Sequence, residues 1–149
     1  MEWMTYENLD RIADAFVPAQ AIVVLVSAFV HLARQRFRLV GRLLVLLVLG
    51  LVLVYAMMHA DNHYGFWPAL GLDYSTHASI ALMLTITLIV AVRGFWWLWC
   101  ALVFAYLGLC LYQRYHTVAD IATTALYLLP SHLGIARLVL GNWRLRALP

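Results

Sequence analysis

The sequence has no lysine, and its ten basic residues other than histidine are all arginines. Charges of both signs are scarce, because only 11% of the 149 residues are charged while 65% are hydrophobic. A soluble domain of this size would have too little polar surface to stay dissolved, so we expect the lipid bilayer to be its solvent. The net charge of +3 does not indicate nucleic-acid binding, because the arginines lie in short clusters between apolar runs.

Cysteine is also scarce, and the N-terminus lacks basic residues. Cys100 and Cys110 lie within one apolar run at a spacing that fits neither a CxxC motif nor a short-loop disulfide, so both are expected to be buried thiols. The chain begins with Glu2, Glu7 and Asp10 where a cleaved signal peptide would be basic. We therefore expect the first hydrophobic segment to remain in the protein.

Five apolar runs approach the length of about 20 residues that crosses roughly 30 Å of hydrocarbon. They are Pro18 to Ala33, Leu39 to Met58, Ser75 to Val92, Phe95 to Tyr112 and Thr117 to Leu140. The sequence thus predicts one all-α membrane domain over residues 1–149, a bundle of about five transmembrane spans. Met1 to Val17 has the pattern of an amphipathic helix at the membrane interface. Pro130 predicts that the last span is kinked or runs as two pieces.

The arginines predict the orientation, because cytoplasmic loops retain positive charge. The link between the first two spans holds four of them: Arg34, Arg36, Arg38 and Arg42. A cytoplasmic link places the C-terminus inside and the N-terminus outside, which in a bacterial inner membrane is the periplasmic side. The segment from His59 to Tyr74 contains no arginine and falls outside. Arg114 breaks the rule, which indicates a role other than topology.

Three polar groups fall together at the outer ends of the spans. They are His59 to His63, Asp73 to His77 and Arg114 to Asp120. Ionisable residues in or beside spans are costly and usually face a protein interior or a wet cavity. His116 and Asp120 are four residues apart, so on a helix they share a face, and the carboxylate can fix the tautomer of the imidazole. His116 would then be a nucleophile or base, and His77, from another helix, could protonate a leaving group.

The remaining histidines have simpler interpretations. The alternating His59-x-Asp61-x-His63 would suit a divalent metal in an extended loop, but such a loop is more commonly just hydrated, and we expect neither a metal ion nor a cofactor. His31 and His132 lie on the cytoplasmic side and are expected to form hydrogen bonds between helices.

Two of these segments resemble the motifs of a known family. Ser75-Thr76-His77 is similar to the Ser-Gly-His element of the type 2 phosphatidic acid phosphatase superfamily, and His116 with Asp120 matches its His-x-x-x-Asp element. The elements stand in the family's order, about forty residues apart. The stretch 112–126 is most similar to the branch of inositol phosphorylceramide synthases and related lipid phosphatases.

The resemblance implies a role for each matching residue. His116 would attack phosphorus to give a phosphohistidine, Asp120 would orient it, His77 would act as the acid and Ser75 would bind phosphate. Further substrate contacts are expected from Arg114, Thr76, His59 and His63. The implied activity is that of a lipid phosphatase or phosphotransferase acting on a phosphorylated headgroup at the outer face.

An alternative stays open. The family's upstream Lys-x6-Arg-Pro element is absent, and Thr76 stands where the family usually has glycine. The chain could therefore be a catalytically degenerate relative that binds lipid, or a membrane protein that binds a metal ion or haem. The expected partners are the bilayer and a lipid phosphate, with no nucleic acid. A homodimer could replace the sixth span that is common in the superfamily.

Overall fold

The computed structural model describes residues 5–141, without the side chain of residue 93, and every regular element in that range is helical. The five α-helices are α1 (Tyr6–Ala33), α2 (Phe37–Tyr64), α3 (Thr76–Ala91), α4 (Trp96–Tyr112) and α5 (Val118–Leu140). Two short 3-10 helices, η1 (Pro68–Leu70) and η2 (Arg93–Phe95), stand in the connections before α3 and α4. The all-α class predicted from the sequence is confirmed.

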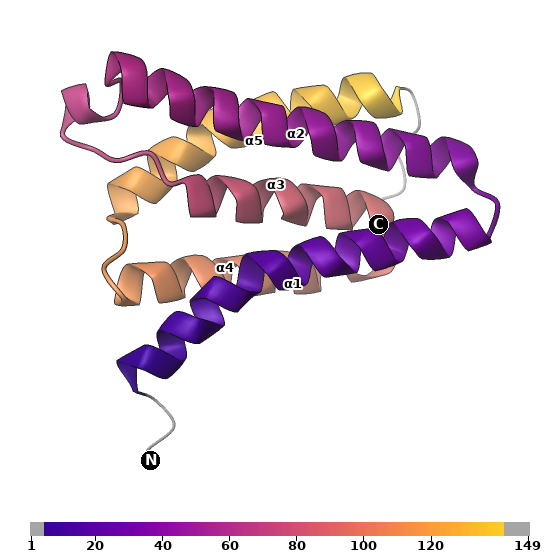
Figure 1. Cartoon of the computed structure of the whole chain (residues 1–149), viewed down its shortest axis with the longest axis horizontal. Helices are drawn as coiled ribbons and strands as arrows, with labels where there is room; N and C mark the ends of the chain where they lie inside the picture. Colours follow the sequence, from indigo (N-terminus) through magenta and orange to yellow (C-terminus); the bar gives the residue numbers. More distant parts are fainter. Residues whose placement is uncertain (1–4, 142–149) are drawn as a thin grey trace.

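The helix α3 forms the centre of the bundle. It contacts each of the other four α-helices (Figure 1). Ten of its sixteen residues are buried, among them Ser79, Thr85 and Thr87. The hydroxyls of Thr85 and Thr87 bond to backbone oxygens one turn earlier, which satisfies polar groups that the surrounding helices exclude from solvent.

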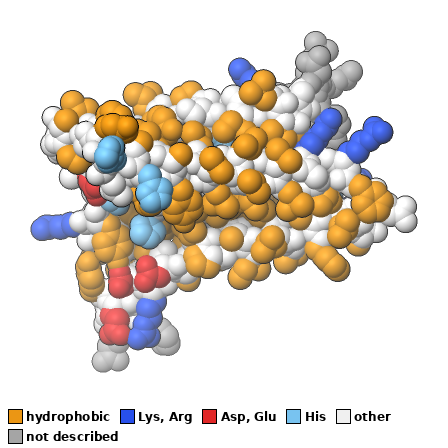
Figure 2. Space-filling model, turned by 45° about the horizontal axis from the view of Figure 1, so that its top comes forward, with side chains coloured by type: hydrophobic (Ala, Val, Ile, Leu, Met, Phe, Trp, Pro, Cys, Tyr) orange, Lys and Arg blue, Asp and Glu red, His pale blue; other side chains and the backbone are white. Residues whose placement is uncertain are grey.

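Three helices are long and apolar enough to cross a membrane, namely α1, α2 and α5. The helices α3 and α4 are apolar but have only 16 and 17 residues. At 1.5 Å per residue, α3 reaches about 24 Å, less than the hydrocarbon thickness of roughly 30 Å. The chain is therefore described as a membrane protein with three candidate spans, and the predicted count of five is not confirmed. Large hydrophobic side chains cover much of the outer surface (Figure 2).

Two expectations about helix boundaries were wrong. The segment up to Val17 is not a separate interfacial helix, because α1 continues through Pro18. Pro18 itself is exposed, while Phe16 on the preceding turn stacks on Tyr106 of α4 at 4.3 Å between ring centroids. Tertiary packing on both sides of the proline thus outweighs the lost backbone hydrogen bond. Met1 to Met4 lie outside the described residues.

The last span runs as one helix through Pro130 and not as two pieces. Pro130 is exposed, whereas Leu128 and His132 on either side of it are fully buried. The buried stripe of α5 is therefore continuous across the proline.

The interior polar residues match expectation only in part. His31 bonds through Nε2 to the carbonyl oxygen of Ala91 at 3.0 Å, so it joins two helices as predicted. His132 does not, because its ring has no hydrogen-bond partner among the described residues. Its ring and the side chain of Met83 both lie against Gly50. Both cysteines are free thiols, Cys110 buried and Cys100 half-buried.

Charge is divided between the two ends of the bundle. We call the end that carries the start of α3 and the start of α5 the polar end, and the end that carries the link between α1 and α2 the arginine end. Histidine and acidic side chains gather at the polar end, and most arginines lie at the arginine end (Figure 2). This division follows the arginine pattern of the sequence.

Candidate functional site

The connection between α2 and α3 forms one wall of the polar end. The helix α2 ends at Gly65, which adopts a left-handed conformation with φ of 68° and donates its N–H to the carbonyl oxygen of Asp61 at 2.7 Å. The Asp61 side chain is buried and accepts a hydrogen bond from the backbone N–H of Trp67 at 2.8 Å. The Trp67 indole N–H donates to Thr123 Oγ1 of α5 at 2.9 Å. These bonds hold the connection against both α2 and α5.

Tyr74 extends this anchorage into the bundle. Its ring is buried edge-on against Trp67, with 5.0 Å between ring centroids. Its hydroxyl donates to the carbonyl oxygen of Val54 at 3.3 Å and accepts from the Ser79 hydroxyl at 2.8 Å. Burial raises the pKa of Tyr74 although the bond with Ser79 acts in the opposite direction. The hydroxyl therefore stays neutral and serves as a fixed hydrogen-bonding group.

The connection between α4 and α5 is set by a Schellman motif. The N–H of Tyr115 bonds to the carbonyl oxygen of Cys110, and that of Arg114 bonds to Leu111, each at 3.1 Å. Arg114 takes the left-handed conformation of this motif, with φ of 58°. Its side chain is exposed at the polar end. The turn places His116 directly before α5.

The structural role of Asp120 differs from the role that the sequence predicts. The N-cap of α5 is Thr117, so His116 lies outside the helix, and the argument that His116 and Asp120 share a helical face is wrong. Asp120 completes a capping box, in which Oδ2 accepts from the N–H of Thr117 at 2.7 Å and from its hydroxyl at 2.8 Å. Its other oxygen, Oδ1, accepts from the backbone N–H of Asp73 at 2.8 Å.

The carboxylate beside His116 is that of Asp73. His116 Nδ1 lies 3.4 Å from Asp73 Oδ2, which is within ion-pair range but does not meet hydrogen-bond geometry. The His116 side chain is 13% exposed and that of Asp73 is 71% exposed. A carboxylate at this distance favours a proton on Nδ1 and leaves Nε2 for reaction. Asp120 holds the backbone that carries Asp73, and its carboxylate also lies close enough to His116 for a direct charge interaction.

The three residues of the Ser75-Thr76-His77 element lie where α3 begins. Ser75 is buried and is the N-cap, accepting from the N–H of Ala78 at 3.2 Å, and its own N–H donates to Thr124 Oγ1 of α5 at 3.2 Å. Thr76 is half-buried. The ring of His77 is exposed on the first turn and forms no hydrogen bond with the part of the chain that the structure describes.

His59 and His63 lie in the last turns of α2 and not in an extended loop. Residues two apart on a helix point in nearly opposite directions, which is why Asp61 is buried while both histidines are exposed. His63 packs edge-on against Tyr64 at 4.6 Å between ring centroids. Among residues 5–141, no three His, Cys, Asp or Glu side chains come together as a possible metal site.

The arrangement brings His116, Asp73 and the starts of two helices to one end of a membrane bundle. Because a helix start carries partial positive charge, α3 and α5 both favour an anion at the polar end. Sequence reasoning missed the role of Asp73, although it noted the segment that contains it. It also missed Gln113, whose buried side-chain amide has no partner among the described residues. A local pattern does not reveal either residue, because their environments are built by segments distant in the chain.

Comparison of the chain with models of protein families, with curated proteins and with solved structures finds no match. The similarity to the phosphatidic acid phosphatase superfamily thus rests on the quoted residues, and the functional argument rests on those residues and their geometry.

Proposed function

We propose that the protein is a lipid phosphatase or lipid phosphotransferase that acts on a phosphorylated lipid headgroup at the polar end. The observation that carries the proposal is the pairing of His116 with the Asp73 carboxylate beside the starts of α3 and α5. A histidine with one ring nitrogen beside a carboxylate has its other ring nitrogen available as a nucleophile.

The reaction proceeds in two displacements at phosphorus. His116 Nε2 bonds to phosphorus while the phosphorus–oxygen bond to the lipid breaks, and the departing oxygen takes a proton from His77. Water, or the hydroxyl of an acceptor alcohol, then attacks the phosphohistidine and gives its proton to His77. Phosphate or a new phosphoester is released, and His116 and His77 return to their initial states.

The other site residues bind and position in this proposal. Arg114 is an exposed cation at the polar end and stabilises charge on the transferring group. Thr76, His59 and His63 contact the headgroup from the rim. Asp73 orients His116, in place of the direct role that the resemblance assigns to Asp120, and Ser75 acts chiefly by capping α3.

The location follows from the arginine pattern. Because cytoplasmic segments retain arginine, the arginine end faces the cytoplasm and the polar end faces the periplasm of a bacterial inner membrane. The substrate would then enter from the outer leaflet of that membrane, where its phosphate lies at the level of the polar end.

A panel of lipid phosphates tests the activity. Purified protein is assayed for phosphate release from phosphatidic acid, phosphatidylglycerophosphate and a polyprenyl diphosphate, together with the variant H116A. We expect H116A to release no phosphate above background. The matched control is H31Q at the arginine end, which should retain full turnover. Full turnover in H116A would refute the proposal.

A second variant tests the role of Asp73. Replacing Asp73 by Asn removes the charge beside His116 but keeps the backbone N–H that Asp120 binds. We expect turnover to fall on the order of tenfold to a hundredfold, because the imidazole loses its orienting carboxylate. The midpoint of thermal unfolding should stay close to that of the parent protein, since the Asp73 side chain is mostly exposed.

One observation favours a second function, that of a relative which binds lipid phosphate without turning it over. Both the Ser75 hydroxyl oxygen and the Asp120 carboxylate, which the resemblance places in the reaction, are occupied by helix caps. Retention of a lipid phosphate by the purified protein, with no hydrolysis of any panel member, would support this function over catalysis.

A further inference from the structure

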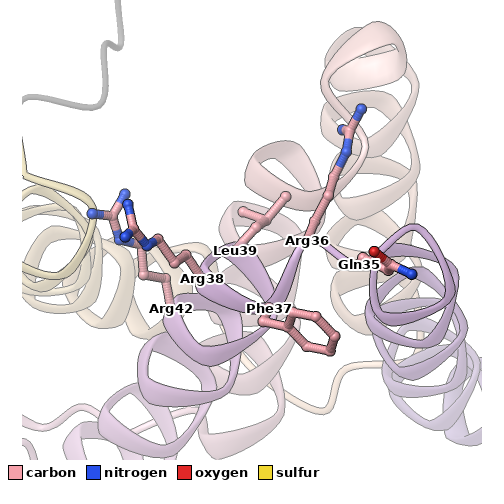
Figure 3. A pocket seen from close by; sticks show the side chains of 6 residues that line it. All are labelled: Gln35, Arg36, Phe37, Arg38, Leu39 and Arg42. Atoms are coloured by element: carbon pink, nitrogen blue, oxygen red, sulfur yellow. The ribbon is translucent and has the colours of Figure 1, made fainter.

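A pocket lies at the arginine end, on the side opposite to the candidate site. Its volume is about 610 Å³. It is lined by Gln35, Arg36, Phe37, Arg38, Leu39 and Arg42 (Figure 3). All six residues come from the link between α1 and α2 and from the first turns of α2. Three guanidinium groups and one aromatic ring thus surround one hollow.

The charge around this pocket is of one sign. No aspartate or glutamate occurs anywhere between Asp14 and Asp61. Arg36 and Arg38 are exposed, and neither forms an ion pair with any residue that the structure describes. These two guanidinium groups therefore carry positive charge that no described acidic side chain neutralises.

The side chain of Arg38 extends from α2 beside that of Arg42. They are one helical turn apart, and Figure 3 shows their side chains extending in the same direction from α2. The planar guanidinium of Arg38 is well suited to paired hydrogen bonds with a phosphate group.

The start of α2 adds to this preference. The helices α1, α3 and α5 each begin with a side-chain cap, from Thr5, Ser75 and Thr117 respectively. The N-cap of α2 is Arg36, which makes no side-chain capping bond. The positive end of a 28-residue helix thus opens beside the arginines.

The apolar lining distinguishes a lipid from a free anion. Phe37 is exposed in the pocket wall, and α1 and α2, which meet here, are both candidate membrane spans. The pocket consequently lies where the spans leave the hydrocarbon, at the level of lipid headgroups. A ligand with a phosphate group and acyl chains meets both the arginines and the apolar ring.

We infer that this pocket binds the phosphate headgroup of an anionic phospholipid from the leaflet at the arginine end. The inference does not depend on the proposed catalytic function, because the pocket and His116 lie at opposite ends of the bundle.

Native mass spectrometry of the purified full chain tests the inference. The protein is titrated with phosphatidylglycerol and with phosphatidylcholine of identical acyl chains, in parallel with inorganic phosphate as a competitor. We expect phosphatidylglycerol to be retained at least about tenfold more tightly, given the strength of attraction of basic residues to anionic headgroups. Inorganic phosphate should not displace it at equal concentration. Equal retention of the two lipids, or displacement by inorganic phosphate, would overturn the inference.

Matched variants place the binding in the pocket. The double variant R36Q/R38Q should bind phosphatidylglycerol about tenfold more weakly. The control R137Q removes an exposed charge from the same end outside the pocket and should change binding less than about twofold. If the double variant does not fold, the single variant R38Q carries the test, with an expected loss of about threefold. Equal losses in R38Q and R137Q would contradict a site in the pocket.

Discussion

The carboxylate of Asp120 accepts a hydrogen bond from the backbone N–H of Asp73, 2.8 Å away, although the two residues are 47 positions apart. The same carboxylate caps α5 through Thr117. One buried side chain thus fixes both the start of a helix and the connection that faces His116. Its loss should disturb the two segments together.

Replacement of Asp120 by Ala is expected to lower stability by about 2–4 kcal/mol, because three donors lose a buried charged acceptor. D120N retains one acceptor oxygen but turns its NH2 group toward the remaining donors, so its stability should be intermediate. Thermal unfolding in detergent measures both. The control is D14A, which removes an exposed acid from α1 at the same end and should change the midpoint little. Equal midpoints of D120A and D14A would contradict the anchoring role.

The helical nature of the chain could be predicted because it depends on local composition. Apolar runs of sufficient length, separated by arginine or by polar residues, specify helices in lipid whatever their neighbours are. The boundaries at Pro18 and Pro130 could not be predicted in this way. Whether a proline ends a helix depends on the packing of the turns around it, and that packing involves other helices.

The sequence predicted which segments meet at the candidate site, but it did not predict which residues pair there. The arginine pattern brought the segments of His77 and His116 to one end, and the structure places the starts of α3 and α5 there. The partner of His116 was misassigned because a spacing of four was assumed to be helical. Thr117 caps the helix one residue later, so His116 lies before the helix, and the carboxylate within ion-pair range of it is that of Asp73.

Gly50 gives α2 a close approach to α3 and α5. A Cβ atom at this position would lie 2.6 Å from Met83 Cγ and 2.7 Å from His132 Cε1. We expect G50A to cost about 1–3 kcal/mol, because Met83 and His132 are fully buried and have little room to shift. The control G108A on α4 meets no atom within 4 Å and should be neutral or stabilising. A midpoint of G50A at or above that of G108A would show that the helices separate without cost.

The bond between Trp67 and Thr123 joins the connection before α3 to the first turns of α5. W67F removes the indole N–H but keeps a ring against Tyr74 and Tyr127, whose centroids lie 5.0 and 6.2 Å away. T123V removes the acceptor with little change in volume. Each variant should lose about 1 kcal/mol through this bond, and the double variant should lose little more than either one alone. A double-mutant cycle from thermal unfolding measures the coupling between them. Strictly additive losses would mean that the connection is held to α5 by ring packing and by the bonds of Asp73 and Ser75, with no contribution from the indole N–H.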